Sequence, residues 1–398
     1  MMIGSWPLVH RLLVIRLDNI GDVIMLGPSL RTLRQALAQA SITLMASPAG
    51  AQAAPLLPWI DDLIIHRALW QDVSGSLTHD PGREQELVET LQERRFDAAL
   101  IFTSFSQSPH PAAYACYLAG IPIRAGQSKE FGGAVLSQWI KPPPDETHQV
   151  DRNLFLLESA GFRPRERHLS LSVPPDARIA ADRLLAEVGI QPGVPFIVLA
   201  PGASCAARRY DPVRYAAVAR QLPSRTGMHV VVVGSLRESE LVRPILDPAH
   251  DGVVSLVGQT SIPQLAAVIE RSALVIANNS GPMHIADAFL RPTLVLYSGT
   301  EYESQWRPRS APATLLKRSV PCSPCYNFHC PYNMECLDVP PEEVLAEALH
   351  MLTQSRLRGE HDETHFNQFS AFSASLWQPQ ASAVNQQEIK HAKEDCPH

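Results

Sequence analysis

A carboxylate follows a glycine at the point where the first apolar run of the chain ends. The segment RLDNIGDVIM, residues 16–25, places Gly21 and Asp22 shortly after LLVI. The run reads as a buried strand, and open α/β sheets bind ligands at the carboxyl ends of their strands. Asp22 is therefore a candidate general base that takes a proton from a hydroxyl group. The alternative is an aspartate that only caps the next helix, and Asp18 is a second carboxylate in the same loop.

Phosphate-binding groups follow strand-like runs in the second half of the chain. Ser280-Gly281 opens a predicted helix, whose free N–H groups and positive dipole end suit a phosphate. Arg208 and Arg209 lie in a strand-end loop and carry forked donors that match phosphate oxygens. The alternatives are a plain helix start and two solvated surface arginines.

Two further side chains have both a functional and a structural interpretation. Glu238 lies four residues after Gly234 at a strand end, where its carboxylate can accept hydrogen bonds from ribose hydroxyls, as in dinucleotide-binding folds. A carboxylate in the first turn of a helix is equally favourable there. His284 falls one turn after Ser280 among apolar residues, where a histidine is usually part of the core.

Four of the seven cysteines are concentrated in the segment CSPCYNFHCPYNMEC. Cys322, Cys325, Cys330 and Cys336 follow a CxxC-x4-C-x5-C pattern, and four thiolates are ligands for zinc or iron. Disulfides and free thiols are the alternatives. The segment lies between the last predicted strand and the final predicted helix, and we expect it to brace that junction and to take no part in catalysis.

Strands and helices that alternate along the chain must position these residues. Strand-like runs with helical patterns between them predict a series of βαβ units and a parallel sheet. The helical and strand-like patterns are lost between residues 162 and 178. Strand-like runs and helical patterns then alternate again in the second half of the chain. We expect an α/β protein of two Rossmann-like domains, 1–170 and 171–355, with a disordered tail over 356–398.

Composition excludes several classes of protein. The 398 residues carry a net charge of −6 without a long basic run, which gives no electrostatic basis for nucleic-acid binding. No run approaches the roughly 18 apolar residues of a membrane span. The first residues lack the small-residue cleavage site of a signal peptide, so we expect a cytoplasmic protein.

The ordered set of motifs resembles glycosyltransferase family 9, the heptosyltransferase-like enzymes of the two-domain GT-B fold. The resemblance covers roughly residues 11–353, and the segments that carry it are IRLDNIGDVIMLGPSLRTLR, LAGIPIRAG, HQVDRNLFLLESAG, PGASCAARRY, VVGS with Glu238, LVGQTSIPQLAAVI and NNSGPMHIADAFLRPTLVLYSG. It implies two domains that face each other across a cleft, with the acceptor bound mainly by the first domain. The aspartate of the strand-end GD is the catalytic base of the family, and Asp22 occupies that position.

The resemblance also implies roles for the donor-binding residues. Arg208 matches a lysine that binds the nucleotide-sugar phosphates, Ser204 a hydroxyl contact in the same loop, and Glu238 the ribose contact. The family element around the diphosphate and the sugar is matched by Asn279, Ser280, Gly281 and His284. Asn279 replaces the aspartate of many members and loses its charge, whereas Arg208 keeps the charge of the lysine.

These observations predict an inverting glycosyltransferase that uses a nucleotide sugar, with ADP-heptose as the donor that the resemblance implies. The acceptor is a glycan, a lipid-linked or natural-product molecule or a protein, and contact with a membrane surface is compatible with it. The resemblance implies that side-chain cations and a helix terminus, rather than a metal, stabilise the departing diphosphate. The sequence has no Asp-x-Asp element in a suitable loop, so we expect catalysis without a metal. Two rival hypotheses are a nucleotide-sugar epimerase of the same architecture and a non-enzymatic metal- or redox-responsive protein built on the four cysteines.

Overall fold

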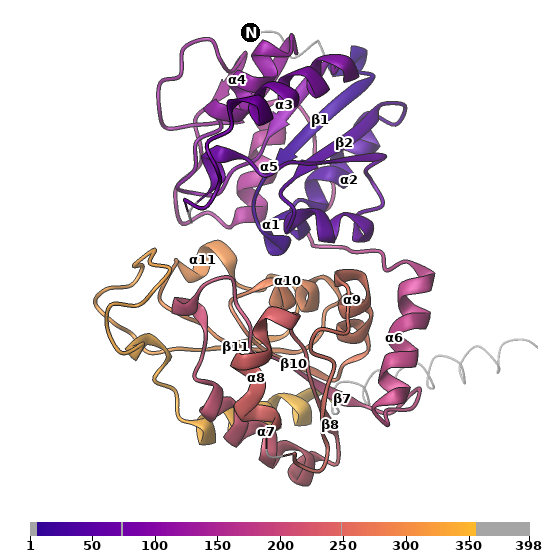
Figure 1. The fold of residues 1–398 in the computed structure, drawn as a ribbon, viewed down its shortest axis with the longest axis vertical. Helices are drawn as coiled ribbons and strands as arrows, with labels where there is room; N and C mark the ends of the chain where they lie inside the picture. The colour runs from indigo at the N-terminus through magenta and orange to yellow at the C-terminus, as the bar shows by residue number, and fades with distance from the viewer. Residues whose placement is uncertain (1–5, 73–74, 248, 356–398) are drawn as a thin grey trace, which may run out of the picture. The chain divides into compact units, whose positions relative to one another are not determined.

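The first half of the chain builds a parallel sheet of six strands, drawn in indigo to magenta in Figure 1. This computed structural model describes residues 6–72, 75–247 and 249–355. The strands lie in the order β3-β2-β1-β4-β5-β6. Their bounds are β1 (Arg11–Arg16), β2 (Ser41–Ala46), β3 (Asp62–Ile65), β4 (Ala98–Ile101), β5 (Ile123–Gln127) and β6 (Gln138–Ile140). All but the first residue of β1 and of β2 are buried, as expected for strands covered on both faces.

The second half builds another six-stranded parallel sheet, in the order β12-β11-β10-β7-β8-β9. Counted from the first strand of each sheet, both have the order 3-2-1-4-5-6 of dinucleotide-binding folds. The bounds are β7 (Phe196–Ala200), β8 (His229–Val232), β9 (Val253–Ser255), β10 (Leu274–Asn278), β11 (Thr293–Leu296) and β12 (Ala313–Leu316).

Helices cover both faces of the first sheet. The buried side chains of α2 and α5 pack on one face with Leu12 and Val14, and those of α3 and α4 pack on the other with Leu13 and Ile15. The short helix α1 directly follows the loop after β1. The bounds are α1 (Ile20–Ile24), α2 (Gly27–Ala36), α3 (Pro81–Arg94), α4 (His110–Leu118) and α5 (Gln149–Ser159).

The second sheet is covered in the same way. Helices α6, α9 and α10 pack on the face of Val198, whereas α7, α8 and the helical residues 341–352 pack on the face of Leu199. The bounds are α6 (Pro175–Glu187), α7 (Pro212–Thr226), α8 (Ser239–Leu246), α9 (Ile262–Arg271), α10 (Gly281–Ala288) and α11 (Glu303–Trp306).

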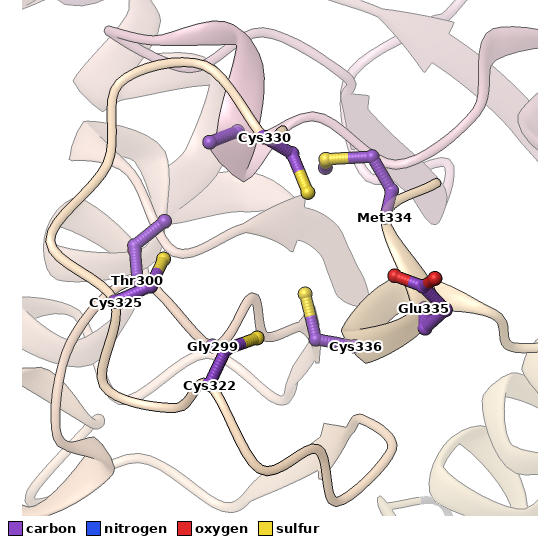
Figure 2. Close-up of a pocket in the computed structure, with 9 residues that line it drawn as sticks. Gly299, Thr300, Cys322, Cys325, Cys330, Met334, Glu335 and Cys336 are labelled. Atoms are coloured by element: carbon purple, nitrogen blue, oxygen red, sulfur yellow. The ribbon is translucent and has the colours of Figure 1, made fainter. Parts of the chain in front are cut away.

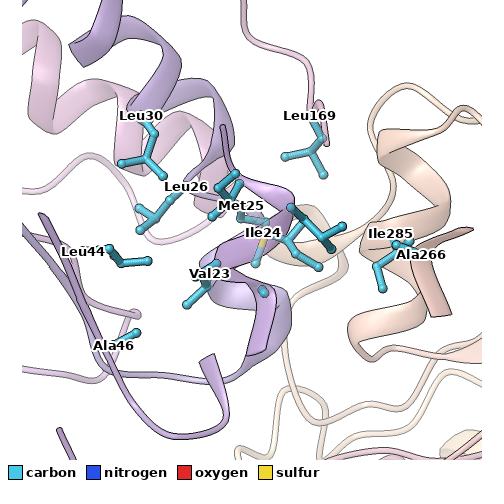
Figure 3. Close-up of a cluster of buried hydrophobic side chains, with 14 of the residues drawn as sticks. Val23, Ile24, Met25, Leu26, Leu30, Leu44, Ala46, Leu169, Ala266 and Ile285 are labelled. Atoms are coloured by element: carbon cyan, nitrogen blue, oxygen red, sulfur yellow. The ribbon is translucent and has the colours of Figure 1, made fainter. Parts of the chain in front are cut away.

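One cluster of buried apolar side chains connects helices of both sheets. Figure 3 shows residues 23–26, in and just after α1, between Leu44 of β2 and the side chains of Ala266 and Ile285 in α9 and α10. All of these side chains are fully buried. Because Asp22 directly precedes this packed segment, apolar packing fixes its position relative to α10.

Each strand-like run in the sequence coincides with a strand, but three strands were not expected. Neither β6 nor β12 has a buried residue, so these edge strands lack an apolar signal. The third, β5, buries an arginine, a glycine and a glutamine, which are not typical strand residues.

Of the segment in which periodicity is lost, residues 162–178, the part 162–174 contains no helix or strand, whereas residues 175–178 form the first turn of α6. The expected tail, 356–398, lies outside the residues that the structure describes. Within the described ranges, no helix is both long and apolar enough to cross a membrane.

Candidate active site

The candidate residues follow the central strands of the two sheets. In the first sheet β1 and β4 are neighbours, and Asp22 follows β1 while Ser104 follows β4. In the second sheet β7 and β10 are neighbours, and Arg208 follows β7 while Asn279 follows β10. The strand order reverses at both places, and open α/β sheets bind ligands at such switch points.

The carboxylate of Asp22 is held by both of its oxygen atoms. Oδ1 accepts a hydrogen bond from Nη2 of Arg16 at 2.7 Å, and Oδ2 accepts one from the backbone N–H of Asn19 at 3.2 Å. The hydroxyl of Ser104 lies 3.4 Å from Oδ1 and accepts from Arg16 Nη2 at 2.8 Å. The side chain is 12% exposed. Asp22 therefore caps α1, as the structural interpretation expects, and keeps an exposed edge.

Asp18 shares the same guanidinium group. Its Oδ2 lies 2.9 Å from Nε of Arg16, and its Oδ1 accepts a hydrogen bond from the amide of Gln107. Burial raises the pKa of Asp18 to about 6, and the neighbouring charge of Asp22 also raises it, whereas Arg16 lowers it. One buried cation thus pairs with both carboxylates of the loop.

Gly21 allows the helices α1 and α10 to approach each other next to Asp22. A Cβ atom on Gly21 would lie 2.8 Å from Cδ2 of His284, which is too close for a real side chain. His284 in α10 is buried, and burial lowers its pKa, whereas the charge of Asp22 raises it. His284 is therefore a core residue that also contacts the loop of the candidate base.

Arg208 forms an ion pair with Glu301, a residue that the sequence analysis did not select. Its Nε also donates to the hydroxyl of Thr300 at 3.3 Å. Burial raises the pKa of Glu301, Arg208 lowers it, and the charge of Asp22 raises it. A phosphate that binds Arg208 must therefore compete with a carboxylate.

The side chain of Asn279 has a defined orientation. Its Oδ1 accepts from the backbone N–H and from the hydroxyl of Ser298, both at 3.2 Å. That hydroxyl lies 3.0 Å from the hydroxyl of Thr300, which accepts from Arg208. Nδ2 of Asn279 is buried without a partner. A buried N–H group without an acceptor is costly, so a ligand oxygen at this point would satisfy it.

Ser280 and Gly281 lie at the start of α10, as the sequence predicts. Ser280 occupies the N-cap position with an extended backbone, but its hydroxyl donates to the carbonyl of Asn278 at 3.4 Å and does not cap the helix. The first N–H groups of α10 consequently have no side-chain cap.

The remaining donor candidates lie at the ends of β7 and β8. Ser204 is exposed. The carboxylate of Glu238 accepts from the backbone N–H and the hydroxyl of Ser235, at 2.7 and 2.9 Å, and forms a capping box. It lies against Gly202, where a side chain would overlap it. Arg209 donates to the carbonyl of Ala203 and is tied to its own loop.

Cys322, Cys325, Cys330 and Cys336 line one small cavity of about 20 Å³. Figure 2 shows the sulfur atoms of Cys322, Cys330 and Cys336 turned toward the space between them. Each of the four is a free cysteine. In the part of the chain that the structure describes, no group of three or more His, Cys, Asp and Glu side chains has the geometry of a metal site. The metal therefore stays a prediction.

The cysteine segment is bonded to the Arg208 region through its backbone. The N–H groups of Cys325 and Tyr326 donate to the carbonyls of Gly299 and Thr300, at 3.1 and 2.9 Å. The N–H of Ala207, directly before Arg208, donates to the carbonyl of Phe328 at 3.0 Å. The segment thus braces the loops that position Arg208.

The structure brings Asp22, His284, Arg208 and Glu301 within electrostatic reach of one another. A carboxylate that can accept a proton thus lies beside a cation and an uncapped helix start that can bind an anion. The sequence analysis did not identify three further residues of the site, Arg16, Ser104 and Glu301. For Arg16 and Glu301 the available signal was a charged residue at or just after the end of a buried strand.

Comparison with known proteins identifies relatives over most of the chain. The family model described as glycosyltransferase family 9 (heptosyltransferase) matches residues 85–335. Lipopolysaccharide heptosyltransferase 2 of Escherichia coli K12 is 26% identical over 358 residues, 86% of this chain and 99% of that protein. Lipopolysaccharide heptosyltransferase 3 of the same strain is 25% identical over 299 residues, 72% of this chain and 82% of that protein.

Solved structures share the fold. A glycosyl transferase family 9 protein from Veillonella parvula superposes with a TM-score of 0.71 at 22% identity, and the match covers 87% of this chain and 97% of that one. The E. coli ADP-heptose LPS heptosyltransferase II gives a TM-score of 0.69 at 24% identity and covers 87% of this chain and 99% of that one. The two sheets therefore form the GT-B fold.

We predict that Gly21→Ala lowers the free energy of unfolding by about 1–3 kcal/mol, because the added methyl group overpacks the contact with His284. Gly281→Ala is the matched control on the facing helix, since a Cβ there meets Ile20 at an ordinary 3.7 Å. Chemical denaturation of both variants measures the effect. Equal stability of Gly21→Ala and the unmodified protein would show that His284 is not packed against Gly21.

Proposed function

Because this chain belongs to glycosyltransferase family 9, we propose that it transfers a heptose from ADP-heptose to an acceptor hydroxyl, with inversion at the anomeric carbon. The names of the E. coli relatives support the sugar. The observation that carries the proposal is that the loop of Asp22 contacts His284 at Gly21, and that Asp22 and Arg208 both act electrostatically on His284 and on Glu301.

Family membership makes the chain a glycosyltransferase, and the comparisons support neither the epimerase nor the non-enzymatic protein. For the donor, we propose that Glu238 binds the ribose and Ser204 adds a hydroxyl contact. Arg208 and the start of α10 at Ser280-Gly281 bind the diphosphate. The Nδ2 group of Asn279 then donates a hydrogen bond to an oxygen of the nucleotide sugar. Nδ2 is buried without an acceptor in this structure, which favours such a contact.

In the proposed reaction, the carboxylate of Asp22 takes the proton of the acceptor hydroxyl as the hydroxyl oxygen attacks the anomeric carbon. The bond from that carbon to the diphosphate oxygen breaks on the opposite face. Arg208 leaves Glu301 for the diphosphate, and its charge stabilises the leaving group most strongly in the transition state. His284, whose pKa burial lowers, stays neutral and positions the Asp22 loop. No step of this scheme uses a metal.

We assign acceptor binding to the domain 1–170 and donor binding to the domain 171–355. The acceptor is a glycan, and the relatives' names point to lipopolysaccharide, whose lipid would bring the enzyme to a membrane surface from the cytoplasm. A natural-product or protein acceptor is the alternative within the same chemistry. Nothing in the proposal involves nucleic acid.

For the cysteine segment, we propose that Cys322, Cys325, Cys330 and Cys336 hold one structural zinc or iron ion. Four thiols that line a single cavity are a donor set suited to such ions. The ion would stabilise the segment that is bonded to Gly299, Thr300 and Ala207.

We predict that Asp22→Asn folds normally and keeps its affinity for ADP-heptose but loses transfer by about 10²–10⁴-fold, because a general base acts only in the chemical step. Transfer and donor binding are measured separately. Asp18→Asn is the matched control, since Asp18 pairs with the same Arg16. If Asp18→Asn loses transfer while Asp22→Asn keeps it, Asp18 is the base.

We predict that Arg208→Ala weakens ADP binding by about tenfold or more, because it removes a charged donor from the diphosphate. Calorimetric titration with ADP measures this. Arg209→Ala, which is tied to Ala203 in the same loop, should bind ADP with nearly unchanged affinity. Glu301→Gln removes the competing carboxylate and should bind ADP at least as tightly. If Arg208→Ala binds ADP with unchanged affinity, Arg208 does not contact the phosphates and Arg209 becomes the better candidate.

We predict that protein purified without chelators or immobilised metal carries about one equivalent of zinc or iron, as a structural four-thiolate site requires. Cys322→Ser with Cys325→Ser should lose the metal and lower the melting temperature, while activity per folded molecule changes less. Cys116→Ser, buried in α4, is the control and should keep the metal. Elemental analysis that finds no metal, with all four thiols titrating as free, would reject the site.

A further inference from the structure

Arg208 and Glu301 form an ion pair that is largely shielded from water. Nη2 of the guanidinium group contacts Oε1 of the carboxylate, and the two side chains are only 22% and 15% exposed. Arg208 follows β7 and Glu301 follows β11, so the pair joins the ends of two strands of the second sheet. A carboxylate with so little access to water depends on its cation to stay charged.

The groups around Glu301 offer no replacement for this cation. Those that interact with it electrostatically are Arg208, Asp22, Tyr297, Tyr326 and Cys205. Burial raises the pKa of the two tyrosines and of the cysteine, so all three are neutral at neutral pH. The charge of Asp22 repels that of Glu301. Within the described ranges, no second lysine or arginine forms an ion pair with Glu301.

A diphosphate that takes Arg208 changes the surroundings of Glu301 in two ways. The carboxylate loses its cation, and a strongly negative group arrives next to it. Burial already raises the pKa of Glu301, and the attraction of Arg208 is what lowers it. Loss of that attraction and the new negative charge both raise the pKa further. The neutral carboxyl group is then the stable form.

We propose that Glu301 is a proton-linked competitor for Arg208: it pairs with Arg208 in the empty site and takes up a proton when a nucleotide diphosphate binds. In this step the ion pair breaks, and an O–H bond forms on the carboxylate with a proton from water or buffer. Release of the diphosphate reverses both changes. A singly charged anion competes less well with the carboxylate, so this arrangement favours a diphosphate. Glu301 acts through Arg208 as a positioning residue, and the nature of the ligand rests on the proposed function.

Calorimetric titration of ADP in buffers with different ionisation enthalpies counts the protons taken up. At about pH 6.5 we expect the unmodified protein to take up at least about half a proton more per ADP than Glu301→Gln. Glu303→Gln is the matched control, since it removes a carboxylate that pairs with Lys317 in the same segment. This control should take up as many protons as the unmodified protein. Equal uptake in Glu301→Gln and the unmodified protein would overturn the proposal.

The pH dependence of ADP affinity gives a second readout. Because the pKa of Glu301 is higher with the ligand than without it, this group strengthens binding as the pH falls, by up to about tenfold per pH unit. Glu301→Gln lacks this contribution, whereas the titration of ADP itself affects both proteins equally. Glu301→Gln should therefore bind ADP more tightly than the unmodified protein at about pH 8, and the ratio of affinities should shrink toward about pH 6. A constant ratio would contradict the proposal.

Infrared difference spectroscopy of the unmodified protein covers a failure of Glu301→Gln to fold. Binding of ADP should add the carbonyl band of a protonated carboxyl group and remove a carboxylate band. The new band should persist in Asp22→Asn, which lacks the other carboxylate that acts on Glu301. If the band is absent, or if it disappears in Asp22→Asn, Glu301 is not the group that takes up the proton.

A transfer assay and a titration with inorganic pyrophosphate separate this proposal from the proposed function. If heptose is transferred from ADP-heptose but ADP binding takes up no proton that depends on Glu301, the competitor role is wrong and the function stands. If pyrophosphate binding takes up a proton that depends on Glu301 but no heptose is transferred, the competitor role stands and the function is wrong.

Discussion

The fully buried guanidinium group of Arg16 is the interaction on which the candidate site depends. A charge without access to water must be paired, and Arg16 pairs with Asp18 and Asp22 and donates to Ser104. These partners come from the loops after β1 and β4, which the strand order makes neighbours. The orientation of Asp22 is therefore set by the topology of the sheet as much as by its own loop.

Helix α10, which packs on the second sheet, contacts the loop of Asp22 so closely that no side chain fits at Gly21. Gly21 has no side chain, and His284 fills the space that a Cβ would need. Behind it, hydrogen bonds run from Arg208 through Thr300 and Ser298 to Asn279. The hydroxyl hydrogens of the serine and the threonine are used within this chain, so the unpartnered amide hydrogens of Asn279 remain for a ligand. The candidate residues Arg208 and Asn279 are thus connected through these hydrogen bonds, and each link orients the next.

The sequence predicts the strands of the two sheets and places Asp22, Arg208 and Asn279 at strand ends, because apolar runs and strand-end polar residues are local signals. It does not predict the partners. Glu301 is 93 positions from Arg208, and Ser104 is 82 from Asp22, so no local pattern links them. The sequence also did not predict β5, β6 and β12. The edge strands β6 and β12 have no buried residue, and β5 contains polar residues, so none of the three has the continuous apolar run that identifies a buried strand.

The most direct test of the account is a crystal structure of the protein with ADP-heptose in which the transfer is blocked by Asp22→Asn. We expect the diphosphate at Arg208 and the start of α10, with Arg208 released from Glu301. The anomeric carbon should face residue 22 on the side opposite the diphosphate. A donor bound with its anomeric carbon away from residue 22, or with Arg208 still paired to Glu301, would contradict the account.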